Sequence, residues 1–281
     1  MIFIHGNGKV MNNITLKAHA KINLTLDIVG KRPDGYHNIK SIMQSIELHD
    51  IVYICRRANI KAPAIALECT NPALPTDNRN IAYRVADYMM KTYGLAEDLH
   101  IKIEKNIPIE AGLGGGSADA AAVLIGIRDL YRLPLDNTQL AEIGKQFGAD
   151  VPFCIYGGTM MAEGIGDILT PLPAFSETYV LLAKPTWGFS TKEMYKKHND
   201  SFKKLETENA FENIEIAGMD MIHEIKAAML EKGATKSLMS GAGSVVFGLF
   251  EDTNVLKSAA ESMKLNYTDL TFITTKTIDL S

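Results

Sequence analysis

The chain has few cysteines, no long apolar run and little net charge, and each absence excludes a class of protein. Its three cysteines (Cys55, Cys69 and Cys154) show neither a paired count nor the spacing of a metal site, which argues against a disulfide framework. No apolar segment is as long as a membrane span, and residues 1–4 are too short for a signal peptide. The net charge of −4 gives no electrostatic reason for nucleic-acid binding. We expect a reduced, cytoplasmic protein without membrane or nucleic-acid partners.

The bulk composition is that of a globular protein. With 281 residues, the chain suits one large domain or two of ordinary size. Hydrophobic residues make up 46% of it and charged residues 22%, which is enough apolar material for a substantial core. There is no internal repeat and no low-complexity segment. We expect a monomer or a weak homodimer.

The segment PIEAGLGGGSADAA, which begins at Pro108, is the most informative one. Four glycines lie within Gly112–Gly116. An alternating, strand-like segment precedes them at Leu99–Glu104, and an alanine-rich helical segment follows at Ala118–Tyr131. Glycine permits positive φ and exposes backbone N–H groups, while the start of a helix adds unpaired donors and a positive dipole end. The order strand, loop, helix therefore predicts a site for a phosphate-bearing ligand.

Two familiar phosphate loops do not match this segment. A Walker A loop ends in Gly-Lys-Ser/Thr, whereas Gly116 is followed directly by Ser117. The dinucleotide fingerprint fits better, but no second strand ending in an acid follows about 20 residues later. An ordinary flexible turn is the plain alternative, although linkers rarely lead straight into an alanine-rich helix.

The remaining pattern predicts strands first and a mixed C-terminal half. The N-terminal part offers strands at Thr15–Ile28 and Ile39–Ile54 and helices at Asn80–Tyr93 and Asp136–Phe147. The C-terminal part has the order β-α-β-β-α-β, which is typical of a ferredoxin-like domain. Its expected elements are Tyr179–Ala183, Met219–Leu230, two short strands around Gly241–Gly243, Val255–Met263 and Thr271–Thr277. The polar run Lys196–Asn213 is interpreted as a solvated surface.

Three separated segments carry residues that packing alone does not require. Lys21 and Asn23 share one face of an otherwise apolar strand, although a strand lysine is more often a solvated charge. Asp150 follows a helix and precedes Pro152, a position where a turn or cap residue is the plain alternative. The segment Ser240–Ser244 also fits a simple hairpin turn.

Together these segments suggest phosphoryl transfer. That chemistry needs a loop for nucleotide phosphates, a cation near the transferred group and a carboxylate that accepts the hydroxyl proton. The glycine loop, Lys21 and Asp150 would fill these roles, and the lysine would keep the aspartate ionised.

The chain resembles the GHMP small-molecule kinases. Their phosphate loop is similar to Pro108–Ser117, and their late Gly-x-Gly turn is similar to Gly241–Gly243. Within the family, four segments together resemble the members that phosphorylate a CDP-linked methylerythritol: Ala20–Leu24, Arg32–His37, Gly112–Ser117 and Gly148–Pro152. The resemblance spans residues 15 to about 277. It implies the α/β (α+β) two-domain GHMP kinase fold: an extension at 1–13, an ATP-binding, ribosomal-protein-S5-like domain at 14–162 and a ferredoxin-like domain at 163–281.

The resemblance also implies an activity and a set of site residues. The reaction would be ATP-dependent phosphorylation of the substrate's 2-hydroxyl in the non-mevalonate route to isoprenoid precursors, with ATP and Mg²⁺ required. Lys21 and Asp150 would be catalytic. The ATP phosphates would meet Pro108, Ile109, Glu110, Ala111, Gly112, Leu113, Gly114, Gly115, Gly116, Ser117 and Ala118. The substrate would meet Asn23, Tyr36, His37, Asp150, Tyr195, Gly241, Ala242 and Gly243.

Side-chain chemistry, as well as the resemblance, supports the residues assigned to the cytidine part of the substrate. A cytosine ring has a π-face and an edge with donors and acceptors, which suits Tyr36, His37 and a second aromatic residue, Tyr195. For Tyr36 alone, a surface tyrosine beside a turn is the plain alternative. Ser117 would contact phosphate or Mg²⁺, and no acidic residue in the motifs is an evident metal ligand.

Two other functions stay open at this point. The first alternative is another GHMP kinase, such as homoserine, mevalonate or galactose kinase. The segment Asp34–His37 argues against these enzymes, because it supplies a cytidine pocket that they do not need. A non-catalytic nucleotide- or RNA-binding module is the second alternative, against which the acidic balance and the pair Lys21 and Asp150 argue.

Overall fold

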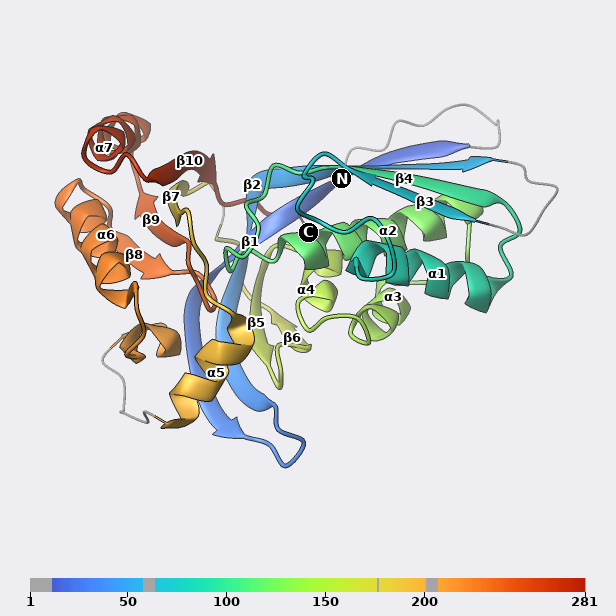
Figure 1. Cartoon of the computed structure of the whole chain (residues 1–281), viewed down its shortest axis with the longest axis horizontal. Helices are drawn as coiled ribbons and strands as arrows, with labels where there is room; N and C mark the ends of the chain where they lie inside the picture. The colour runs from blue at the N-terminus through green and yellow to red at the C-terminus, as the bar shows by residue number, and fades with distance from the viewer. Residues whose placement is uncertain (1–11, 58–63, 176, 201–206, 281) are drawn as a thin grey trace.

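Two β-sheets, each with helices packed on it, make up the protein (Figure 1). The structure is a computed structural model that describes residues 12–57, 64–175, 177–200 and 207–280. The expected N-terminal extension at 1–13 lies almost entirely outside these residues, and Asn13 is already the first residue of a strand. No helix in the described ranges is long and apolar enough to cross a bilayer.

The first sheet has six strands in the order β3-β4-β2-β5-β6, with β1 paired to β2. These strands are β1 (Asn13–Lys31), β2 (His37–Arg57), β3 (Ile65–Cys69), β4 (Asp98–Glu104), β5 (Thr159–Glu163) and β6 (Ile168–Pro171). Four helices lie beneath its β1-β2-β4-β3 part in Figure 1: α1 (Ile81–Tyr93), α2 (Gly115–Tyr131), α3 (Asn137–Gly144) and α4 (Val151–Tyr156). The core lies between this sheet and α2, whose alanines let it approach the strands closely.

Local sequence signals set the helix ends. The side chain of Asn80 accepts from the Ala82 N–H at the start of α1, and Gly94 ends that helix in the left-handed conformation. Asp136 and Gln139 form a capping box at the start of α3. The predicted helices at Asn80–Tyr93 and Asp136–Phe147 are present, whereas α4 was not predicted, because six residues are too few to show a helical period.

The second sheet confirms the ferredoxin-like prediction. Its four antiparallel strands, in the order β10-β7-β9-β8, are β7 (Tyr179–Pro185), β8 (Lys236–Met239), β9 (Val246–Phe250) and β10 (Leu270–Lys276). The helices α6 (Met219–Glu231) and α7 (Thr253–Asn266) pack on it. Between β7 and α6 the chain adds α5 (Thr191–Asp200) and the short 3₁₀ helix η1 (Ala210–Asn213).

The inserted segment corrects one expectation. The run Lys196–Asn213 was interpreted as a solvated surface, but Asn209 and Glu212 are each about 1% exposed. The Asn209 amide donates to the carbonyls of Met239 and Gly241, and a Glu212 oxygen accepts from the Met239 N–H at 2.7 Å. These polar residues are buried because they satisfy backbone groups at the end of β8.

The β5–β6 hairpin bears on the domain boundary. β6 is hydrogen-bonded to β5 in the first sheet, and β7 is the next strand along the chain and belongs to the second sheet. A boundary after residue 162 would divide this hairpin. We propose to place the boundary in the connection between Pro171 and Tyr179.

Candidate active site

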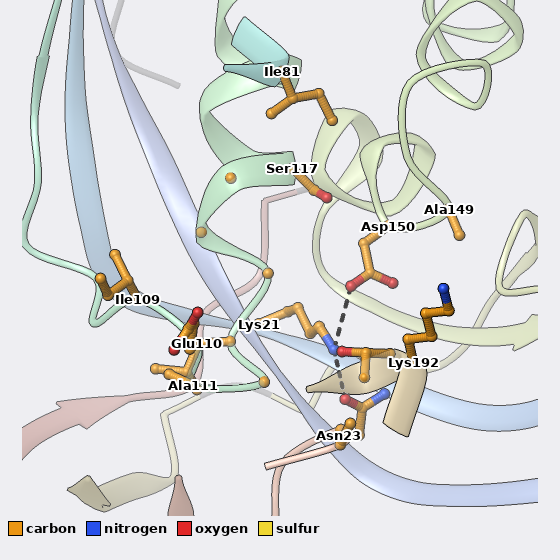
Figure 2. A pocket seen from close by; sticks show the side chains of 18 of the residues that line it. Lys21, Asn23, Ile81, Ile109, Glu110, Ala111, Ser117, Ala149, Asp150 and Lys192 are labelled. Carbon is orange, nitrogen blue, oxygen red and sulfur yellow. Dashed lines mark hydrogen bonds and ion pairs between the residues drawn. The ribbon is translucent and has the colours of Figure 1, made fainter. Parts of the chain in front are cut away.

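Lys21 lies in the middle of β1 with its side chain almost fully buried. Its ammonium donates to Asn23 Oδ1 at 2.6 Å and lies 3.5 Å from Asp150 Oδ2. Figure 2 shows the three side chains converging from β1 and from the residue before α4. The register of β1 on β2 shifts on both sides of Lys21 and Asn23, so bulges flank this pair of residues. The expected convergence of lysine and aspartate is therefore present.

Asn23 is held by a chain of hydrogen bonds. Its amide nitrogen donates to Ser41 Oγ at 2.8 Å, and that hydroxyl donates to the Thr25 carbonyl at 2.6 Å. The amide oxygen consequently faces Lys21. Asp150 differs because its side chain keeps 29% of its exposure, so a ligand in the cavity can reach the carboxylate. An ionised carboxylate beside an ammonium can accept a proton while the cation stabilises negative charge.

The glycine loop lies directly against Lys21. The Lys21 N–H donates to the Leu113 carbonyl at 3.0 Å. Gly114 has φ of 70° as the residue before α2, and a Cβ there would lie 3.0 Å from Lys21 Cγ. A side chain at this position would be strained and would displace the lysine.

The same loop joins the two halves of the molecule. A Cβ at Gly112 would lie only 1.9 Å from the Ser240 carbonyl oxygen. The Ser240 hydroxyl donates to the Gly112 carbonyl at 3.0 Å, and the Val245 N–H donates to the Ala111 carbonyl at 3.3 Å. The turn between β8 and β9 is therefore part of the site as well as a hairpin turn.

A cavity of about 1040 Å³ collects most of the expected site residues. Its walls include Lys21, Asn23, Tyr36, His37, Pro108, Ile109, Glu110, Ala111, Gly112, Leu113, Gly114, Gly115, Gly116, Ser117, Asp150, Tyr195, Gly241 and Ala242. Ala118 and Gly243 do not line it. Ala118 is buried within α2, and Gly243 packs against Met239 and Phe189.

Aromatic rings gather at one end of the cavity. The rings of His37 and Tyr195 are stacked, with centroids 4.9 Å apart and planes 16° apart. Tyr195 meets Phe211 edge to face, and burial, followed by the charge of Asp150, raises its pKa to about 12. Tyr36 is 62% exposed, on the loop between β1 and β2. This end offers a flat ring surface beside an imidazole.

The sequence interpretation missed a second cluster of charges beside the loop. The Lys105 ammonium is bonded to Asp50 and, at 2.8 Å, to Asp119 Oδ2. Asp50 Oδ1 also accepts from the N–H groups of Asn106 and Ile107 at 2.6 and 2.8 Å. Burial raises the pKa of Asp119 to about 7, against the lowering effect of Lys105 and together with the repulsion of Asp50. One sequence feature could have indicated this cluster: Lys105 and Asp119 have opposite charges and lie just before and just after the glycine segment.

Comparison with known proteins identifies the family. The models of the GHMP kinase N-terminal and C-terminal domains match residues 80–158 and 190–269. A 4-diphosphocytidyl-2-C-methyl-D-erythritol kinase of Acetivibrio thermocellus is 46% identical over 275 residues, which cover 90% of this chain and 96% of the relative. The chain belongs to the 4-diphosphocytidyl-2-C-methyl-D-erythritol kinase family. A Clostridium botulinum protein with that name is 41% identical over 282 residues, which cover 93% of this chain and 99% of the relative.

Solved structures agree with membership of the 4-diphosphocytidyl-2-C-methyl-D-erythritol kinase family. A crystal structure of 4-(cytidine 5'-diphospho)-2C-methyl-D-erythritol kinase has a TM-score of 0.77 and 28% identity, covering 94% of this chain and 99% of that one. Homoserine kinase of Cytophaga hutchinsonii has a TM-score of 0.76 at 16% identity, covering 99% of this chain and 98% of that one, a likeness of fold alone. The two-domain GHMP kinase fold is confirmed, and the protein is an ATP-dependent small-molecule kinase.

Proposed function

We propose that the protein transfers the γ-phosphoryl group of ATP to the 2-hydroxyl of 4-diphosphocytidyl-2-C-methyl-D-erythritol, giving the 2-phosphate and ADP. One observation carries the proposal: Lys21 and Asp150 lie 3.5 Å apart in the cavity that also holds the glycine loop and the ring stack of His37 and Tyr195. Such a kinase would act in the non-mevalonate supply of isoprenoid precursors. We place it in the cytoplasm, in keeping with its three free thiols.

Asp150 serves in this proposal as the base. Its carboxylate accepts the proton of the substrate hydroxyl as that oxygen attacks the γ-phosphorus. The Lys21 ammonium, beside this carboxylate, stabilises the negative charge of the transferred group. Asn23 Oδ1 holds the ammonium in place, and the N–H groups around Gly114–Ser117 bind the ATP phosphates.

Mg²⁺ fits this site as a companion of ATP. Within the described ranges no group of three or more acidic, histidine or cysteine side chains is arranged to hold a metal ion. Mg²⁺ characteristically keeps several waters and binds substrate phosphates with one or two protein oxygens. The Ser117 hydroxyl, which lines the cavity, is the protein oxygen we assign to it. Bound there, the ion neutralises charge on the phosphates.

The aromatic end serves as the cytidine site. Tyr36 and Tyr195 offer ring faces to the cytosine, and the His37 imidazole offers hydrogen bonds to its edge. Gly241 and Ala242 line the same cavity from the turn that packs against Gly112. A kinase for homoserine, mevalonate or galactose has no use for this end of the cavity.

A substrate panel tests the proposal. Purified protein with ATP and Mg²⁺ is given the CDP-linked methylerythritol, homoserine, mevalonate or galactose, and ADP release is measured. We expect turnover with the CDP-linked substrate at a kcat/KM at least about 1000-fold above the others. Preferred turnover of another alcohol would reject the substrate assignment, and no turnover of any would favour the non-catalytic module.

A further inference from the structure

Helix α5 carries two lysines that face the cavity one helical turn apart. Lys192 and Lys196 both line it, together with Tyr195 of the same helix. Figure 2 shows the Lys192 side chain extending alongside Asp150, on the side of the cavity away from the glycine loop. The two lysines therefore line the same cavity as the ring stack and the Lys21–Asp150 pair.

The other cations of the cavity already have carboxylate partners. Lys21 pairs with Asp150, and Lys105 is bonded to Asp50 and Asp119. Arg79 pairs with Asp77 at 2.8 Å. Within the described part of the chain, neither Lys192 nor Lys196 is in an ion pair. Among the cavity cations of the described residues, these two lysines have no carboxylate partner to give up before they bind an anionic ligand.

The positions of these two lysines make helix α5 less stable when no anion is bound. Like charges at i and i+4 repel each other along a helix face. Lys192 also lies in the first turn of α5, where the helix dipole favours negative charge. An anion bound against this face would offset the repulsion between the lysines and supply the negative charge that the helix N-terminus favours. The helix and the bound anion would therefore stabilise one another.

We propose that Lys192 and Lys196 bind the diphosphate of the acceptor substrate. This inference rests on the proposed function, which puts cytosine at the His37–Tyr195 end and the attacking hydroxyl at Asp150. In that substrate the diphosphate lies between the two, and α5 carries both Tyr195 of the ring stack and Lys192, which extends alongside Asp150. The lysines then select a nucleoside-diphosphate-linked alcohol over an uncharged one, because only the former supplies the anion they face.

Steady-state kinetics test the proposal with matched variants. We expect Lys192→Ala and Lys196→Ala each to raise KM for the CDP-linked substrate about tenfold, as for the loss of one charge-assisted contact, with kcat within about twofold and KM for ATP unchanged. Lys192→Arg keeps the charge and should recover most of the affinity. Lys197→Ala makes the same charge change on the same helix away from this cavity and should leave KM nearly unchanged. An unchanged KM in the double variant Lys192→Ala/Lys196→Ala, or an increase confined to ATP, would overturn the inference.

A binding measurement separates this inference from the proposed function. CDP and cytidine are titrated calorimetrically into each protein with the ATP site filled by a non-hydrolysable analogue. We expect the wild type to bind CDP more tightly than cytidine, and the double variant to lose about tenfold or more of that preference. Equal losses for both ligands would instead indicate a damaged base pocket and reject a diphosphate contact. Failure of the wild type to phosphorylate the CDP-linked alcohol would reject the proposed function, whatever the CDP preference shows.

Discussion

Two lysines flank the same glycine loop in opposite surroundings. Lys21 faces one carboxylate, Asp150, at 3.5 Å, and that carboxylate keeps 29% of its exposure. Lys105 lies between Asp50 and Asp119, whose side chains are 0% and 5% exposed. A charge pair that a ligand can reach can exchange protons and partners, whereas buried charges depend on one another for hydrogen bonds, and Asp119 Oδ1 has no partner among the described residues.

Both lysines lie close to the backbone of the glycine loop. A Cβ at Gly114 would lie 3.0 Å from Lys21 Cγ, and a Cβ at Gly115 would lie 3.3 Å from Lys105 Nζ. Consecutive glycines thus let both lysines approach the backbone of the loop. We infer that Lys21 acts on the reacting groups and that Lys105, with its two carboxylate partners, stabilises the conformation of the loop.

The largest effect is expected from Asp150→Asn. The amide keeps the shape but cannot take a proton, so kcat should fall by about 1000-fold or more. The affinity for an ATP analogue and the melting temperature should change little, because Asp150 is partly exposed. Single-turnover kinetics with calorimetric titration of the analogue measure both. Asp220→Asn, an exposed change on α6, is the matched control, and near-normal turnover of Asp150→Asn would remove Asp150 as the base.

Lys105→Met is expected to act on stability. The change leaves two buried carboxylates without their cation, which typically reduces the free energy of unfolding by about 3 kcal/mol. Urea unfolding followed by circular dichroism measures the loss. The exposed Lys232→Met on the loop after α6 should stay within about 0.5 kcal/mol of the wild type. A loss as small as that of the control would show that Lys105 does not organise the cluster.

The sequence pointed to Lys21 and Asp150, which the structure brings together, and it missed the cluster of Lys105, Asp50 and Asp119. Lys21 stood out because a charge interrupted an apolar strand, and Asp150 because apolar residues surrounded it. Lys105, in contrast, follows an alternating strand whose polar residues look solvated. Its partners lie 55 and 14 positions away. Only the pairing of β2 with β4, in which Ile51 faces Glu104, brings Asp50 beside it.

Local sequence also failed to predict helix α4 and the burial of residues on helix α5. The six residues of α4 are too few for periodicity, and Pro152 reads as a turn signal although it suits the first turn of a helix. The polar sequence after Lys196 indicated a surface, yet His198 is 8% exposed against the His37 ring. Burial of such residues depends on packing between distant segments, which local pattern does not encode.

Lys21→Met sharpens the contrast between the two lysines. We expect kcat to fall by about 100-fold, because the transferred phosphoryl group loses a cation. The free energy of unfolding should fall by less than for Lys105→Met, since Asp150 is left partly solvated and not buried. Parallel kinetics and urea unfolding of the two variants provide the measurement. A larger stability loss in Lys21→Met than in Lys105→Met would reverse our assignment of roles.

The smallest expected effect is a pH dependence from Asp119. Burial raises the pKa of this carboxyl from 3.8 to about 7, so between about pH 4 and 7 the folded state holds a proton that the unfolded state has released. The free energy of unfolding must therefore fall as pH rises through this range, by roughly 1 kcal/mol or more from this group. Asp119→Asn lacks the titration and should show a flatter profile in urea unfolding at pH 5 and pH 8. Equal slopes for the two proteins would place the titrating proton elsewhere, and the buried cluster would then stay charged throughout.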